Sequence, residues 1–265
     1  MPGPDDVIKE IDRVTLWTFE NIFMQVYWAE EKKEESERGI KTLRDYLHLV
    51  STISSRLEGG KVEVDIWCGH SFLTKDYPEG TPEKDKNDPK LFFDSRPAER
   101  GGQTAVRPLS TCGTTFLPDG TEENLFAFTE DITTPTGPIE LIVICADMFE
   151  HWNTNPIGIS GSLQNLRTAT LVKRPPLDVL TWNVATLLLH EISHSALMGP
   201  GDGTRDHAYR WKNLVKLTGE KALNNADSFA YFIIAMYFDR NNWASGLARA
   251  LPGDGSGVVD ADAED

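Results

Sequence analysis

The segment Leu189–His194 constrains the fold of this chain more than any other, because it has the sequence Leu-His-Glu-Ile-Ser-His. Two histidines four residues apart lie on one face of an α-helix, one turn from each other, so both imidazoles can bind one metal ion. Glu191 lies next to the first histidine and can take a proton from a metal-bound water. The pattern therefore predicts a helix that presents His190, Glu191 and His194 to a metal.

The pattern His-Glu-x-x-His is weak evidence by itself, because two unrelated polar positions on a helix can produce it. The residues before it strengthen it. An apolar run, Leu187–Leu189, precedes the motif, as expected of a buried helix whose polar face lines a cleft. Apolar residues at helical spacing predict that the helix covers Leu177–Met198 and ends at Gly199.

A catalytic zinc site needs a third protein ligand, because zinc usually takes three and leaves one position for water. The position six residues after His194 is Pro200, which excludes the metzincin pattern with its third histidine. Glu220 could follow the thermolysin-like pattern, but it comes after a Thr-Gly break and matches poorly. On the residues alone, three later side chains stay open as ligands: Asp202, Asp206 and His207.

The residues that follow resemble a known family of metallopeptidases. Gly203–Tyr209 reads Gly-Thr-Arg-Asp-His-Ala-Tyr, similar to the Gly-Thr-x-Asp-x-x-Tyr motif that follows His-Glu-x-x-His in the deuterolysin or aspzincin family. Ala222–Ser228 resembles that family's Asn-Ala-Asp segment, and Cys145–Phe149 resembles its Cys-x-x-x-Phe segment. The motifs occur in the family's order, and the resemblance spans about residues 61–239.

The resemblance implies a zinc metalloendopeptidase with a zincin-like fold, acting on peptides or proteins. The Zn²⁺ ligands would be His190, His194 and Asp206. Zinc would lower the pKa of a bound water and polarise the scissile carbonyl. Glu191 would take the proton from that water and pass it to the leaving amine, and Tyr209 would donate a hydrogen bond to the oxyanion.

Two further residues are candidates for substrate binding, Asp227 and His207. In the lysine-specific branch of the resembled family, an acidic pair at Asp-x-x-Glu spacing binds the substrate's ammonium group. The matching positions here are Asp227 and Ala230, so only half of the pair is present and we expect specificity that is not restricted to lysine. Asp227 could still favour basic residues, or it could instead orient a zinc-bound histidine. On the predicted helix, His207 would point about 100° away from Asp206.

Three features depart from the family. The glycine that follows the tyrosine is replaced by Arg210, which could alter the turn there. The loop between His194 and Asp206 is longer than in the shorter members. The chain has three cysteines, which cannot form the two disulfides of the secreted members. The resemblance places a cysteine after each of two strands. It implies that Cys68 pairs with Cys145 in an oxidising compartment, whereas three reduced thiols are the alternative in the cytosol.

Periodicity predicts an α+β protein, mostly helical with a small antiparallel-rich sheet. Alternating apolar residues predict strands at Lys61–Cys68, Thr114–Leu117, Asn124–Thr129 and Ile139–Cys145. Helical spacing predicts helices at residues 5–34, 40–57, 206–217, 221–239 and 243–250. Residues 76–103 read as a long surface loop. We expect three regions: a helical segment over 1–60 packed on the core, a zincin-like catalytic domain over 61–250, and a disordered acidic tail over 251–265.

Composition excludes several classes of partner. The 26 basic and 41 acidic residues give a net charge of −15, which argues against a nucleic-acid or anionic-membrane surface. No apolar run approaches the ~18 residues that span a bilayer. We therefore expect a soluble monomer. The segment Met1–Asp6 has no signal-peptide features. Secretion is implied by the resemblance, and an intracellular location is the alternative.

Two other functions use the same residues. Two histidines and one carboxylate also describe a mononuclear iron site, and a zincin scaffold can be recruited for non-peptide, biosynthetic chemistry or for zinc binding without proteolysis. A third hypothesis is a degenerate zincin that serves for binding alone and has lost catalysis. The intact Glu191 and Tyr209 argue against it.

Overall fold

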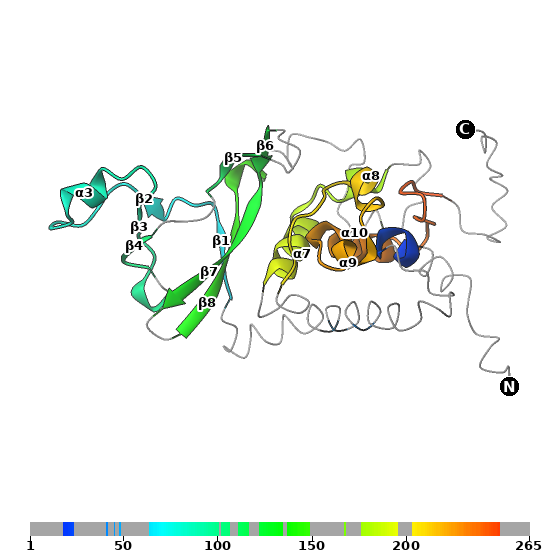
Figure 1. Ribbon diagram of the computed structural model, residues 1–265, viewed down its shortest axis with the longest axis horizontal. Coiled ribbons are helices and arrows are strands. Elements are labelled where there is room, and N and C mark those ends of the chain that lie inside the picture. Colours follow the sequence, from blue (N-terminus) through cyan, green and yellow to red (C-terminus); the bar gives the residue numbers. More distant parts are fainter. Residues whose placement is uncertain are drawn as a thin grey trace. The chain divides into compact units, whose positions relative to one another are not determined.

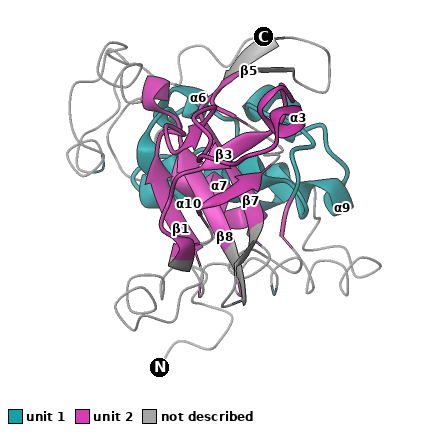
Figure 2. Ribbon diagram, turned by 90° about the vertical axis from the view of Figure 1, so that its left-hand side faces the viewer, with its two compact units in different colours: residues 1–43, 156–186, 205–265 teal, residues 44–155, 187–204 magenta. Residues whose placement is uncertain are grey.

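A computed structural model describes part of the chain in detail. The described residues are 18–23, 41, 45, 48, 64–100, 102–106, 111–116, 122–134, 137–148, 167, 176–195 and 203–249. The chain divides into two compact units that are interleaved along the sequence (Figure 2). Unit 1 comprises residues 1–43, 156–186 and 205–265, and unit 2 comprises residues 44–155 and 187–204.

The main sheet of unit 2 has three strands in the order β1-β8-β7 (Figure 1). Strand β1 (Val64–Cys68) is parallel to β8 (Gly137–Ile144), and β7 (Ala127–Thr134) is antiparallel to β8. The central position of β8 explains its sequence, because successive residues from Leu141 to Ile144 are buried and both faces of the strand are covered. This sheet is therefore mixed, although the other strand pairings in the described part are antiparallel, in agreement with the predicted antiparallel-rich character.

The other strands in the described part form two smaller sheets. Strands β2 (Leu73–Thr74), β3 (Phe92–Asp94) and β4 (Thr104–Val106) pair antiparallel, as do β5 (Gly113–Phe116) and β6 (Glu122–Leu125). The prediction of one long loop over residues 76–103 is wrong in part. This segment contains a short helix α3 (Glu83–Lys86), strand β3 and a 3₁₀ turn, Ala98–Arg100.

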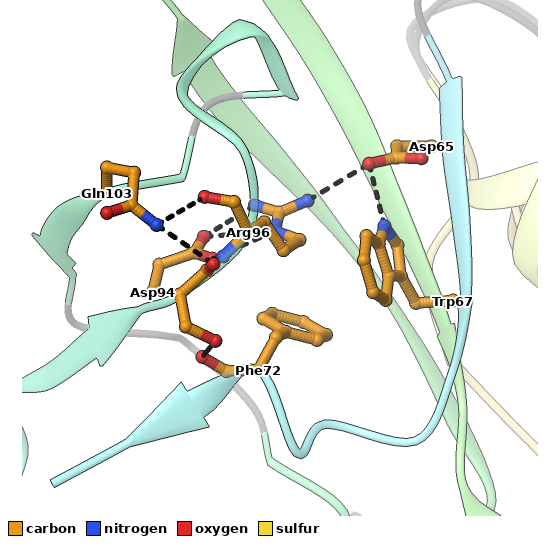
Figure 3. A network of polar contacts seen from close by, with 7 residues as sticks. Asp65, Trp67, Phe72, Asp94, Arg96 and Gln103 are labelled. Atoms are coloured by element: carbon orange, nitrogen blue, oxygen red, sulfur yellow. Dashed lines mark hydrogen bonds and ion pairs between the residues drawn. The ribbon is translucent and has the colours of Figure 1, made fainter. Parts of the chain in front are cut away.

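A buried arginine holds this segment in place. The guanidinium of Arg96 is fully buried and contacts the Asp94 carboxylate at 2.6 Å and the Asp65 carboxylate at 3.4 Å (Figure 3). It also lies 4.8 Å from the ring centroid of Phe72. The Trp67 indole donates to Asp65 at 2.7 Å, which connects β1 to the same network. Removing one partner of such a buried pair typically costs about 3–5 kcal/mol, because the other charge is left uncompensated.

The disulfide in the structure joins Cys112 to Cys145, and Cys68 is free and exposed. The expected pairing of Cys68 with Cys145 is therefore wrong. Strand register gives the reason: Cys68 lies opposite Ile144, so these two side chains share one face of the sheet. Cys145 follows Ile144, and its side chain is directed to the other face and completely buried.

The disulfide predicts the result of a thiol titration. Under denaturing, non-reducing conditions the oxidised protein should contain one reactive thiol per chain, and the Cys68→Ser variant should contain none. Full reduction should raise the counts to three in the wild type and two in the variant. Three reactive thiols before reduction would contradict the Cys112–Cys145 bond.

Unit 1 is helical in its described part, and its longest helix is α10 (Ala226–Tyr237). The others are α6 (Leu177–Leu180), α8 (Trp211–Leu214) and α9 (Gly219–Ala222). Helix α10 is buried on most sides, as its apolar sequence requires. The helical residues 18–23 contribute two phenylalanines to it: Phe23 lies 5.3 Å from Phe229, and Phe19 lies 6.2 Å from Phe232, between ring centroids.

Within the described residues, the predicted helix over residues 177–198 is two helices, α6 and α7 (Val184–His194). Asn183 separates them, because its side-chain Oδ1 accepts the Thr186 amide at 2.8 Å and so begins a new helix. The helix predicted over 221–239 is likewise divided into α9 and α10. Residues 243–249 form turns and take part in two isolated bridges instead of the predicted helix.

The observed helices with small mixed and antiparallel sheets are compatible with the α+β class. None of the described helices is long and apolar enough to cross a membrane. Residues 41, 45 and 48 are helical, but most of the two predicted N-terminal helices lies outside the described residues. The same holds for the region boundaries at residues 60 and 250 and for the tail, so the three-region division stays a prediction.

Candidate metal centre

Helix α7 brings the two histidines of the motif together. The Nε2 atoms of His190 and His194 are 3.2 Å apart. A tetrahedral zinc ion with Zn–N bonds of about 2.0–2.1 Å would separate two ligand nitrogens by roughly 3.3 Å. The spacing predicted from the helix period is therefore present, and it suits a shared metal ion.

The carbonyl of Thr204 orients the His194 ring. It lies 3.0 Å from Nδ1, so an N–H at Nδ1 can donate to it and leave the Nε2 lone pair for a metal. The Thr204 amide donates to the Ser193 carbonyl at 2.8 Å, which returns the chain to the end of α7. Gly203 makes this approach possible. It has φ of +86°, and a Cβ there would lie 2.1 Å from the His194 carbonyl oxygen.

Asp206 is the third member of a group that can hold a metal. The ligand atoms of His190, His194 and Asp206 all lie within 4.8 Å of one another. His190 is buried, His194 is half-buried and Asp206 is exposed. Two imidazole nitrogens and one carboxylate oxygen match the ligand types of catalytic zinc sites, which keep a position for water. Among the described residues, neither Glu220 nor His207 is part of this group.

Glu191 is buried in unit 2 and contacts strand β7. The Thr129 hydroxyl lies 2.8 Å from Oε2 of Glu191 and 3.0 Å from its backbone oxygen. Only 4% of Glu191 is exposed, so this contact fixes the carboxylate in a largely water-free environment. The Glu191 carboxylate is thus buried and held against strand β7.

Tyr209 and His207 lie in an irregular segment of unit 1, not in the predicted helix over 206–217, of which α8 alone is formed. The Tyr209 carbonyl accepts from the Asn213 amide group at 3.1 Å. His207 Nε2 lies 3.0 Å from Asn224 Oδ1. Asp227 Oδ2 accepts the Arg210 backbone amide at 3.2 Å, so this carboxylate has a partner within the unit.

Comparison with known families gives one match. Residues 179–234, which are 56 of the 265 residues, match the Aspzincin M35 family model, described as lysine-specific metallo-endopeptidase. The aspzincin resemblance is confirmed. The matched segment contains α7, α8, α9 and most of α10, and it supports a metallopeptidase in general. No curated protein and no solved structure matches the chain.

Arg210, which replaces the glycine of the aspzincin motif, has a backbone conformation that glycine adopts more readily than other residues. Arg210 has φ of +70° and ψ of 146°, a backbone conformation that residues other than glycine rarely adopt. The surrounding hydrogen bonds hold the strained residue, because the amides of Arg210 and Trp211 donate to Asp227 and Asp178.

Restoring the aspzincin glycine should therefore stabilise the protein. We expect Arg210→Gly to raise the free energy of unfolding by about 1 kcal/mol, since relief of backbone strain of about 1–3 kcal/mol is partly offset by the greater entropy of an unfolded glycine. Arg240→Gly is the matched control and should not stabilise. Urea unfolding of both variants provides the measurement. A loss of stability in Arg210→Gly would contradict the strained conformation.

Several residues around the aspzincin motifs were not predicted from the sequence. Asp178 Oδ1 accepts the Tyr231 hydroxyl at 2.6 Å and the Trp211 amide at 2.7 Å. Burial raises the pKa of the Tyr231 phenol well above its ordinary value, and the Asp227 and Asp178 carboxylates raise it further. Tyr231 therefore stays neutral and donates. Asp178 and Thr129 lie outside any recognised motif, and only the tertiary contacts identify them.

Proposed function

We propose that the protein is a zinc-dependent metalloendopeptidase that hydrolyses peptide bonds in peptide or protein substrates. The observation that carries the proposal is the convergence of His190, His194 and Asp206 at a spacing suited to one metal ion. The aspzincin match over the same residues supports it, because that family is described as metallo-endopeptidases.

In this proposal each residue has one chemical task. His190, His194 and Asp206 would hold the zinc, which when bound supplies a Lewis acid that acidifies water and polarises a carbonyl. Glu191 accepts the proton of the attacking water on its carboxylate and delivers it to the leaving amine. Tyr209 donates its phenolic hydrogen to the developing oxyanion. The buried position of Glu191 and its contact with Thr129 support the base role, since the carboxylate is held before substrate binds.

The first test combines metal content with a substrate screen. Native mass spectrometry should find one zinc per chain, and the zinc-loaded protein should cleave casein or internally quenched peptides. Removal of zinc by a chelator should abolish cleavage, and added zinc should restore it. Bound metal without cleavage of any peptide would support non-peptide chemistry or simple zinc binding instead. Iron as the native metal would support the mononuclear iron alternative.

We propose further that cleavage is not restricted to lysine. Ala230 is completely buried in α10 and offers no carboxylate, and Asp227 already accepts the Arg210 amide. One carboxylate that already accepts a backbone amide should favour basic substrate residues only weakly. The net charge of −15 nevertheless attracts cationic peptides. Mass spectrometry of a cleaved peptide library should show several residue types at the new N-termini. Products that all begin with lysine would overturn this prediction.

A further inference from the structure

The segment Asn224–Ala226, just before α10, binds both peptide groups that flank Asp206. On the N-terminal side, the Arg205 carbonyl accepts the Ala226 amide at 3.0 Å, and the Arg205 amide donates to the Asn224 carbonyl at 2.9 Å. On the C-terminal side, the His207 amide donates to the side chain of Asn225 at 2.8 Å. The peptide planes before and after Asp206 are therefore both fixed, and with them its φ and ψ angles.

The side chain of Asn225 makes the C-terminal half of this arrangement. Its Oδ1 accepts two successive amides, His207 at 2.8 Å and Ala208 at 2.9 Å, and its Nδ2 donates to Ser228 Oγ at 3.1 Å. Asn225 is completely buried; its bond to Ser228 is buried, and its bonds to the amides of His207 and Ala208 are partly buried. If the side chain were truncated, the two amides would lose their acceptor in a region that is only partly accessible to water.

The position of Asn225 in the chain makes this use of its side chain unexpected. Asn225 is the N-cap residue of α10, and an asparagine there usually accepts an amide of its own helix. Here its side chain makes no such capping bond. The oxygen instead binds the amides of His207 and Ala208, 18 and 17 residues earlier in the chain. Helix capping alone does not explain this orientation.

We propose that Asn225 is a positioning residue for Asp206: it fixes the backbone on which the carboxylate is presented to the metal. This inference rests on the proposed role of Asp206 as a zinc ligand. Asp206 is exposed, and the hydrogen bonds to the peptide groups on both sides of it fix the backbone from which its carboxylate extends. Residues that orient metal ligands typically change metal affinity by about 10- to 100-fold when they are replaced.

The test compares three single variants by zinc competition with a chromophoric chelator. Asn225→Ala removes the acceptor and should weaken zinc binding by about 10- to 100-fold. Asn225→Asp keeps an oxygen at the same place to accept the two amides, so it should bind zinc within a few-fold of wild type. Asn242→Ala is the control, because Asn242 Oδ1 also accepts a backbone amide, that of Ala244 at 3.0 Å, in a segment without proposed ligands. It should leave zinc affinity unchanged.

Hydrogen exchange of the metal-free proteins supplies a readout that does not depend on zinc. The peptide that contains residues 207 and 208 should exchange faster in Asn225→Ala than in wild type and Asn225→Asp, while peptides from β8 exchange alike in all three. If Asn225→Ala does not fold, Asn225→Ser replaces it, since its hydroxyl is too short to reach both amides. Zinc affinity that is equal in Asn225→Ala and Asn242→Ala would overturn the positioning role. Wild-type protein that binds no zinc would instead refute the proposed function.

Discussion

Glu191→Gln should keep its zinc and lose about 10²- to 10⁴-fold in turnover, the usual contribution of general acid–base catalysis. Glutamine has the shape of glutamate and can still contact the Thr129 hydroxyl, but it cannot accept a proton at neutral pH. Two measurements on the same sample check this result: zinc per chain by mass spectrometry, and initial rates on a quenched peptide.

Glu220→Gln is the matched control for this variant, because it makes the same chemical change at an exposed position of α9. It should retain full activity and full zinc. Tyr209→Phe should also retain zinc but lose roughly 10²-fold in rate, the size expected for one oxyanion donor. Normal turnover in Glu191→Gln would exclude Glu191 as the base, and loss of zinc in that variant would make it a structural residue.

Asp206→Ala should lose zinc affinity itself. Structural zinc sites with four protein ligands bind with about 10–16 kcal/mol, so removal of one ligand should cost roughly 10²- to 10³-fold or more in affinity. Activity should disappear at zinc concentrations that saturate the wild type. Chelator competition measures the affinity, and a thermal melt of the metal-free protein shows whether the fold survives.

Two alternative ligands provide the controls for Asp206→Ala. His207→Ala and Asp202→Ala should each keep zinc affinity within a few-fold of wild type. His207 contacts Asn224 in the structure, and Asp202 lies outside the described residues. Stoichiometric zinc and full activity in Asp206→Ala would remove Asp206 from the site, and the variant of these two that does lose zinc would identify the replacement ligand.

The sequence was sufficient to predict the part of the site that depends on one helix. His190 and His194 are four residues apart, and the helical period alone places their imidazoles together. The same local reasoning failed where tertiary contacts decide the conformation. It extended a helix through residues 206–210, because it could not foresee that Asn225 and Asp227 would bind the amides of that segment instead.

The strands show the same limit. Alternation predicted β1 correctly, but it also implied that Ile66 faces inward, and Ile66 is 40% exposed. Trp67 packs against the core cluster on the opposite face, next to the buried Arg96. Register likewise decided the disulfide: the motif suggested which cysteine is paired, Cys145, but only the pairing of β1 with β8 shows why Cys68 is not its partner.

The interleaving of the two units sets the order in which the protein can fold during biosynthesis. Phe23 packs against Phe229, and 206 residues separate them in the chain. At a translation rate of about 5–20 residues per second, the ribosome needs roughly 10–40 s to make the second after the first. Throughout that interval the apolar side chains of residues 18–23 lack their partners from α10. We therefore expect newly made chains to depend on chaperones, and slower growth at low temperature with chaperone co-expression should raise the soluble yield.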